Sequence, residues 1–152
     1  MIRKIQQGQS QICQEILSSL PDWFAIQSAN ENYAAQSEEL PFFVYFKEKE
    51  ACGLCMLKTH STVHTELSLI AVKPEYHGRG LGKELLETAS SFIKHNFPKT
   101  KYLSVKTLSP KKQDPYYLNT YNFYKAIGFK DFEELSDLWD KNNPCLMMIK
   151  DI

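Results

Sequence analysis

The stretch of residues 66–83, ELSLIAVKPEYHGRGLGK, constrains the fold of this chain more than any other part of the sequence. Residues 67–72 are mainly aliphatic and are followed by Lys73 and Pro74. Because proline cannot donate to a sheet ladder, a buried strand is predicted to end there. Glycine then occupies every second position from 78 to 82, and apolar residues recur beyond it at helical spacing. The predicted order is strand, glycine loop, helix.

The glycine loop is suited to binding an anion. Without side chains, the backbone N–H groups of residues 77–82 can approach a ligand closely, and the first N–H groups of the next helix lack partners within it. The helix dipole favours negative charge at the same place. Arg79 and Lys83 add positive charge. A ligand that carries phosphate is therefore expected at the loop.

The glycine spacing discriminates between classes of phosphate ligand. A P-loop has four residues before its Gly-Lys-Ser/Thr, whereas three residues separate Gly78 from Gly82, and Lys83 is followed by Glu84. The interpretation as a nucleoside triphosphate site fails for that reason. A dinucleotide site needs Gly-x-Gly-x-x-Gly and an acidic residue about 20 positions further on. The next predicted strand, 101–108, carries lysines and no acid, so that interpretation is weak too.

Two motifs resemble the GNAT superfamily of N-acetyltransferases. Residues 77–82, His-Gly-Arg-Gly-Leu-Gly, resemble its pyrophosphate loop, and residues 120–129, Thr-Tyr-Asn-Phe-Tyr-Lys-Ala-Ile-Gly-Phe, resemble its late helix. For the loop alone, a purely structural glycine turn is the alternative. The resemblance implies a single N-acetyltransferase domain over residues 1–152. It also implies an α/β (α+β) fold, with a mixed, mostly antiparallel sheet of six to seven strands flanked by about four helices.

The resemblance implies an enzyme that moves the acetyl group of acetyl-CoA, its acyl-donor cosubstrate, directly to a primary amine. A non-catalytic acyl-CoA-binding regulatory module is the alternative from another class. A third interpretation, a redox or zinc protein, rests on Cys52 and Cys55 with His60 and His64. Only four residues separate Cys55 from His60, and a zinc finger needs about a dozen between its pairs. We therefore expect buried thiols and no metal.

Acyl transfer needs a neutral amine, a held oxyanion and a proton for the departing thiolate. By resemblance, Glu66 matches a glutamate that serves some family members as the base, often through water, and His64 is the substitute. Strand alternation places both on one face with Ser68. Tyr124 matches the family tyrosine that protonates the thiolate. The structural alternatives are an exposed strand carboxylate for Glu66 and a core aromatic residue for Tyr124.

The resemblance also assigns contacts to CoA, and the backbone N–H of Ile70 or Ala71 is implied as the oxyanion donor. Two positions depart from the family pattern. His77 replaces the usual Gln or Arg, and Asn119 lies five residues before Tyr124 instead of seven. The expected cofactor-binding residues are Leu69, Ile70, Ala71, Val72, His77, Gly78, Arg79, Gly80, Leu81, Gly82, Lys83, Asn119 and Tyr124.

Composition limits the partners. A chain of 152 residues with 43% hydrophobic content suits one domain. Basic and acidic residues balance at 18 each, so no overall field favours nucleic acid or an anionic membrane. No signal peptide is visible, and no apolar run reaches the roughly 20 residues of a membrane helix. We expect a cytoplasmic protein whose partner is a small-molecule or protein amine, with no nucleic-acid or membrane partner; a homodimer is left open.

Other elements are predicted from local signals. The segment 131–140 carries five carboxylates and no base, which would favour a cationic acceptor if it borders the acceptor site; a solvated acidic loop is the alternative. The remaining predictions are a strand at 2–5, a helix with Ser10 as N-cap, a poorer helix at 30–38, a hairpin of 41–47 with 51–59, a helix from Asp114 to Gly128, and a final hairpin of 129–134 with 145–150 around a loop.

Overall fold

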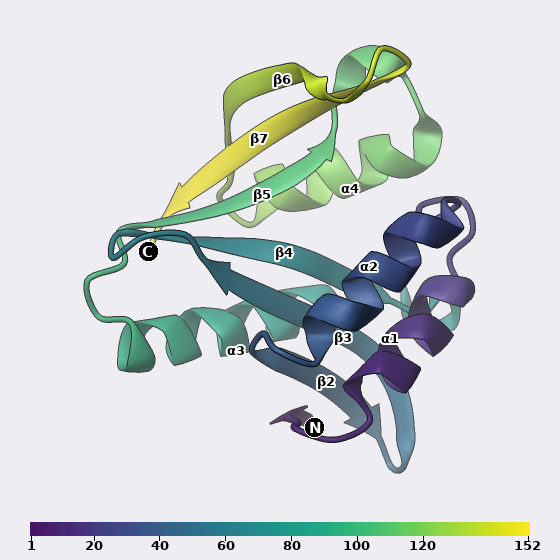
Figure 1. Cartoon of the computed structure of the whole chain (residues 1–152), viewed down its shortest axis with the longest axis vertical. Coiled ribbons are helices and arrows are strands. Elements are labelled where there is room, and N and C mark those ends of the chain that lie inside the picture. Colours follow the sequence, from purple (N-terminus) through teal and green to yellow (C-terminus); the bar gives the residue numbers. More distant parts are fainter. The chain divides into compact units, whose positions relative to one another are not determined.

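A computed structural model describes all 152 residues of the chain. Seven strands form one mixed sheet in the order β1-β2-β3-β4-β5-β7-β6, accompanied by four α-helices (Figure 1). The predicted class, sheet size and number of helices are thereby confirmed. The chain divides into two compact units, Met1–Lys58 with Leu67–Pro98 and Thr59–Glu66 with Lys99–Ile152. No helix has the length and apolar character needed to span a membrane.

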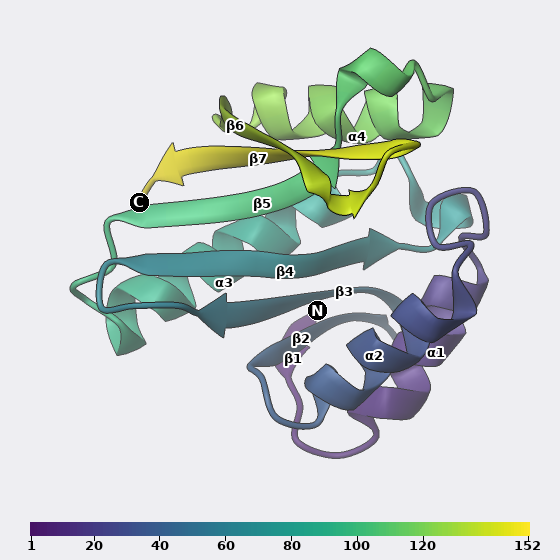
Figure 2. The same ribbon diagram turned by 45° about the horizontal axis from the view of Figure 1, so that its top comes forward.

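The first unit is built on an antiparallel hairpin with helices on both of its faces (Figure 2). Its apolar core joins α1 and α2 to inward side chains of β2, β3 and β4, with Ile16, Phe42 and Leu54 fully buried. On the other face, α3 approaches closely enough that a Cβ on Gly53 would lie 3.3 Å from Leu85. The elements are β1 (Ile2–Lys4), α1 (Gln9–Ser18), α2 (Gln27–Ser37), β2 (Phe42–Lys47), β3 (Glu50–Thr59), most of β4 (His64–Val72) and α3 (Leu81–Asn96).

The second unit contains the start of β4, followed by β5 (Tyr102–Leu108), α4 (Pro115–Ala126), β6 (Lys130–Asp140) and β7 (Asn143–Asp151). β4 pairs in parallel with β5, which places Glu66 beside Ser104. β5 pairs antiparallel with β7, which places Leu103 opposite Lys150. Because side chains alternate, Glu66 and Ser104 share one face and Leu103 and Lys150 the other. α4 covers the second of these faces, since Lys150 Nζ donates to the Ile127 carbonyl at its C-terminal end over 2.7 Å.

Local signals predicted both ends of α4 correctly. Asp114 is the N-cap, and its carboxylate accepts from the N–H groups of Tyr116 and Tyr117 at 2.9 and 3.2 Å. Pro115 occupies the first helical position, where its missing N–H costs nothing. Gly128 follows the helix with φ 105°, a left-handed conformation that glycine adopts without strain.

The start of α1 and the final hairpin differ from the predictions. Gly8, with φ 78°, is the N-cap of α1, and Ser10 lies inside the first turn, where its N–H donates to a carboxylate oxygen of Glu38 at 3.1 Å. The predicted loop between the last two strands is mostly strand. β6 continues to Asp140, whose carboxylate accepts from Asn142 N–H at 2.8 Å and closes a tight turn into β7. Pairing with β7 anchors both ends of this polar segment, at Leu135 and Asp140, with an irregular stretch between them, and the composition does not reveal this pairing.

Candidate active site

The glycine loop follows β4 as predicted. β4 ends at Val72, a short 3₁₀ helix covers Pro74–Tyr76, and α3 begins at Leu81. Gly78 and Gly80 have φ values of 75° and 83°, in the left-handed region that favours glycine. A Cβ at either position would meet no atom within 4 Å. Glycine is therefore required there by the backbone conformation and not by packing.

The N-terminus of α3 presents backbone donors. No side chain caps the helix, and its first hydrogen bond joins Glu84 N–H to the Gly80 carbonyl at 3.1 Å. The N–H groups of residues 81–83 therefore have no acceptor inside the helix. Together with the helix dipole, such donors fit a phosphate or pyrophosphate group. Lys83 is exposed in the first turn and adds a mobile positive charge.

His77, which departs from the family pattern, is turned toward the strand. Its Nε2 donates to the Val72 carbonyl oxygen over 2.6 Å. The edge of its ring contacts Trp23, with 5.5 Å between ring centroids. The histidine therefore holds the head of the loop against the end of β4. The sequence motif left the role of this side chain open.

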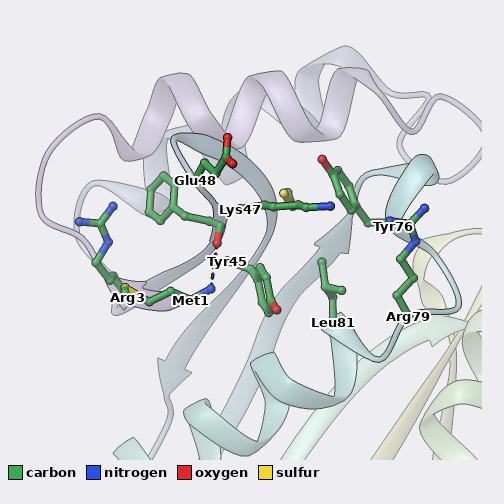
Figure 3. A pocket seen from close by; sticks show the side chains of 10 residues that line it. Met1, Arg3, Tyr45, Lys47, Glu48, Tyr76, Arg79 and Leu81 are labelled. Atoms are coloured by element: carbon green, nitrogen blue, oxygen red, sulfur yellow. Dashed lines mark hydrogen bonds between the residues drawn. The ribbon is translucent and has the colours of Figure 1, made fainter.

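The side chain of Arg79 lies over an aromatic ring. Its guanidinium carbon is 5.5 Å from the centroid of Tyr76, and Lys47 Nζ is 5.7 Å from the same centroid. Figure 3 shows these two cations on either side of the ring. All three residues line a cavity of about 460 Å³. Tyr76 donates to Glu50 Oε2 at 2.8 Å, and this bond raises the pKa of the phenol above its ordinary value. Local sequence gave no sign that Lys47 and Tyr76 would lie beside Arg79.

The last residues of β4 can offer a ligand mainly their backbone groups and few of their side chains. Leu69 and Ala71 are buried in the apolar core, so a ligand can meet only their peptide groups. Ile70 and Val72 are half-buried on the other face. Burial alternates along β4 from Leu67 onward, whereas Thr65, Glu66 and Leu67 are all buried.

Glu66 is the buried member of a partly exposed cluster with His60 and Lys106 in the second unit. Its Oε1 lies 2.7 Å from His60 Nε2, and Lys106 Nζ is 3.3 Å from each carboxylate oxygen. The glutamate residue is only 7% exposed. It is therefore not the exposed strand carboxylate considered as the structural alternative. His60 and Lys106 were missed as its partners, although the parallel register of β4 and β5 makes the Lys106 contact possible.

His64, the substitute candidate for the base, lies beside this cluster. Its Nε2 is 2.6 Å from Ser104 Oγ, and its ring stacks on His60 with 4.9 Å between centroids. Burial lowers the pKa of His64 below its usual value, and the neighbouring His60 lowers it further. His64 is therefore held mainly in its neutral form near pH 7.

The late helix carries two more predicted residues. Tyr124 is buried on α4 and contacts the ring of Phe129, with 5.5 Å between centroids. Asn119 is exposed, and its five-residue separation from Tyr124 puts it on another side of the helix. α4 covers the face of the second unit's strands opposite to the face with Glu66. The two predicted catalytic residues thus lie on opposite faces of those strands.

The acidic segment is a strand whose carboxylates are mostly engaged. Asp131 accepts from Tyr121 OH at 3.0 Å, and Glu134 pairs with Lys111 at 2.6 Å. The lysine holds the pKa of Glu134 below its usual value.

The cysteines form no cluster that could bind a metal. All four are free and buried, including Cys52 and Cys55 of the apparent redox motif. No group of three or more His, Cys, Asp or Glu side chains is arranged to hold a metal ion.

Comparisons with known proteins agree on one family. The family model of the acetyltransferase (GNAT) domain matches residues 38–131. No curated protein matches the chain. The GNAT family acetyltransferase from Elizabethkingia anophelis, solved with acetyl-CoA bound, is 16% identical, with a TM-score of 0.75 over 100% of this chain and 97% of that one.

Two further solved structures share the fold. The ribosomal-protein-S18-alanine N-acetyltransferase from Escherichia coli is 16% identical, with a TM-score of 0.78 over 100% of this chain and 93% of that one. The PaiA N-acetyltransferase from Thermoplasma acidophilum, solved with coenzyme A, is 19% identical, with a TM-score of 0.74 over 100% and 98% of the two chains. At these identities the likeness extends to the fold alone, whereas the family model covers well over half of the sequence. The chain therefore belongs to the GNAT family of acetyltransferases.

Proposed function

We propose that this acetyltransferase uses acetyl-CoA as donor and passes the acetyl group directly to a primary amine of a cationic acceptor. The observation that carries the proposal is the β4–loop–α3 segment, where left-handed glycines precede an uncapped helix N-terminus. Such a cradle fits the pyrophosphate of CoA. The whole chain, residues 1–152, is proposed to act as one catalytic domain in the cytoplasm.

The donor would be held by backbone and by mobile cations. The N–H groups of residues 78–83 would bind the pyrophosphate, with Arg79 and Lys83 balancing its charge. The pantetheine arm would hydrogen-bond to the backbone of residues 69–72 in the manner of an added strand. In this arrangement Ile70 or Ala71 N–H would hold the oxyanion. His77 would act by keeping the loop in place and not by touching the cofactor.

The chemistry needs a base and an acid. Glu66 would supply the negative charge that draws a proton from the acceptor ammonium, either itself or through a bridging group. Tyr124 would give its phenol proton to the departing CoA thiolate. The ordinary pKa values of a phenol, about 10, and of a thiol, about 8.5, make that transfer only slightly uphill. The amine attacks the thioester itself, so no covalent enzyme intermediate is needed.

Charge supports the proposed class of acceptor. The second unit presents the strand with five carboxylates in residues 131–140 and only Lys130 at its start, which favours a cation over an anion. A polyamine, an aminoglycoside and a protein N-terminus all meet this requirement. The alanine acceptor named for the Escherichia coli structure belongs to that protein and motivates only one member of a test panel.

The test is acetyl-CoA-dependent release of CoA with spermidine, kanamycin and a peptide that begins with alanine. Wild type and Tyr124→Phe are compared, and CoA binding is measured by calorimetry for both. Turnover in wild type that falls at least tenfold in the variant, with unchanged CoA affinity, supports the enzyme. CoA binding without turnover on any amine would contradict the proposal and favour the non-catalytic acyl-CoA-binding module.

A further inference from the structure

We infer that His60, held by Glu66, is the group that takes the proton from the acceptor amine. This inference rests on the proposed function and deepens it, because it names the bridging group between the acceptor and Glu66. It starts from one contact: His60 Nε2 lies 2.7 Å from Glu66 Oε1. His60 precedes β4 by four residues, and the family motifs assign it no role; the sequence marked it only as part of the zinc interpretation.

The contact determines which imidazole nitrogen is basic. A carboxylate only accepts hydrogen bonds, so Nε2 of His60 carries the proton that is donated to Glu66. In the neutral ring, Nδ1 then has the free lone pair. A carboxylate that selects the tautomer of a histidine in this way also stabilises the imidazolium when it forms. Nδ1 is therefore the atom prepared to accept a proton.

The side chains of Glu66 and His60 differ in their exposure to solvent. The Glu66 side chain is 9% exposed, whereas that of His60 is 33% exposed. Both oxygens of the glutamate also accept from Lys106 Nζ, at 3.3 Å each. An acceptor ammonium can therefore reach the imidazole of His60 while the Glu66–Lys106 contacts stay intact. To reach the Glu66 carboxylate, it would have to break those contacts. Glu66 is thus a positioning residue and His60 the catalytic one.

The position of His60 is set by its surroundings. Its backbone N–H donates to the His64 carbonyl at 2.9 Å, and its ring stacks on the ring of His64. The charged and titratable groups around His60 and Glu66 are His64 from β4 and Lys106 from β5, and Cys145 from β7 interacts with Glu66 and Lys106. Burial raises the pKa of the Cys145 thiol to about 11, so Cys145 stays neutral. His60 and Glu66 therefore lie next to one fixed cation, Lys106.

The proton balance is complete. One ammonium proton passes from the acceptor to His60 Nδ1 and then to solvent. The amine lone pair forms the new C–N bond as the C–S bond breaks, and the thiolate takes the phenol proton of Tyr124. The second N–H proton, released from the new amide nitrogen, restores the phenol. Each turnover yields the acetylated amine, CoA and one proton in solution.

The test is the pH profile of kcat/KM between pH 5.5 and 9, measured with the panel amine that wild type acetylates fastest. His60→Gln should lower kcat about 100-fold, abolish the acid limb and leave CoA affinity unchanged. Glu66→Gln should also slow turnover. Lys106→Met should move the acid limb to higher pH, because removing a cation makes the imidazolium easier to form.

Matched controls separate catalysis from structure. His95→Gln, at the last turn of α3, should leave the profile unchanged. His64→Gln, which removes the stacked neighbour, should keep an acid limb. Long-range ¹H–¹⁵N spectra of wild type should place the His60 proton on Nε2; a proton on Nδ1 would overturn the inference, even where His60→Gln does not fold.

The outcomes distinguish this inference from the proposed function. If wild type turns over and His60→Gln keeps both the acid limb and a kcat within about threefold of wild type, the inference is wrong and the acetyltransferase stands. If the wild-type protein acetylates no amine, the proposed function is wrong whatever the variants do, and the inference about His60 is wrong with it.

Discussion

His77 Nε2 donates a hydrogen bond to the carbonyl oxygen of Val72 over 2.6 Å, and this bond ties the glycine loop to the end of β4. The bond joins residues five positions apart and encloses the 3₁₀ helix Pro74–Tyr76. It fixes where the loop starts relative to the strand. The geometry of the anion cradle therefore depends on a side chain that points away from it.

Replacing His77 with Ala should loosen the loop. The change removes the bond to Val72 and the ring contact with Trp23, at a cost to the free energy of unfolding of roughly 0.5–1 kcal/mol. CoA should bind several-fold more weakly, because its backbone donors are less well placed. Calorimetry and urea denaturation measure the two effects. His77→Gln keeps a donor and should lose less; equal CoA affinity in His77→Ala and wild type would contradict this account.

Gly80→Ala should weaken CoA binding through the backbone alone. At φ 83°, an L side chain costs about 1 kcal/mol or more, although its Cβ would meet no neighbouring atom. Gly53→Ala is the matched control. At Gly53 a Cβ would lie 3.1 Å from the Ala71 carbonyl oxygen. The free energy of unfolding should therefore fall because of steric crowding and not because of an unfavourable φ. Urea denaturation should show both losses, whereas the larger loss of CoA affinity should accompany Gly80→Ala; the reverse order would refute the assignment of the loop.

His64 should make the protein less stable in mild acid. Burial lowers its pKa in the folded state below the unfolded value of about 6.5, so the unfolded chain binds more protons just below that pH. The free energy of unfolding therefore falls as the pH drops below about 6.5. His64→Gln should remove this part of the dependence. Urea midpoints at pH 7.5 and 5.5 measure it; an identical decrease in variant and wild type would exclude the role of His64.

The four cysteines should react slowly in the native protein. Burial raises the pKa of Cys55 to about 12 and that of Cys13 to about 11, so little thiolate forms at pH 8. A disulfide reagent should titrate all four thiols in urea and few of them without it. The same property keeps the background low when released CoA is measured as free thiol. Rapid native reaction of even one thiol would show that its burial is incomplete.

Several elements were predictable because their causes are local. Four features each depend on a few neighbouring residues: the end of β4 just before Pro74, the left-handed glycines before α3, the Asp114 cap and the Gly128 stop. Local steric and hydrogen-bonding rules act within such distances. The family motifs lie in the same segments, so fold class and family could both be predicted from the sequence.

The wrong predictions share a different cause. Ser10 is a good N-cap by composition, but Gly8 begins the helix and Ser10 meets Glu38 from the end of α2. The segment 135–140 looks like a polar loop, yet it extends β6 and pairs with β7 at both of its ends. In both cases a partner outside the local segment, a distant helix end for Ser10 and the adjoining strand for 135–140, overrode local propensity.

By itself, the sequence determined the glycine cradle, because conformation at glycine and at a helix start depends on adjacent residues. It also determined that Glu66 stands six residues before the end of β4. Only the tertiary structure decided what Glu66 contacts. The turn before β4 brings His60 to it, and the parallel register with β5 brings Lys106, 40 positions away. The electrostatic partners of a residue depend on distance in space. The register between two strands cannot be predicted from the sequence of either strand alone.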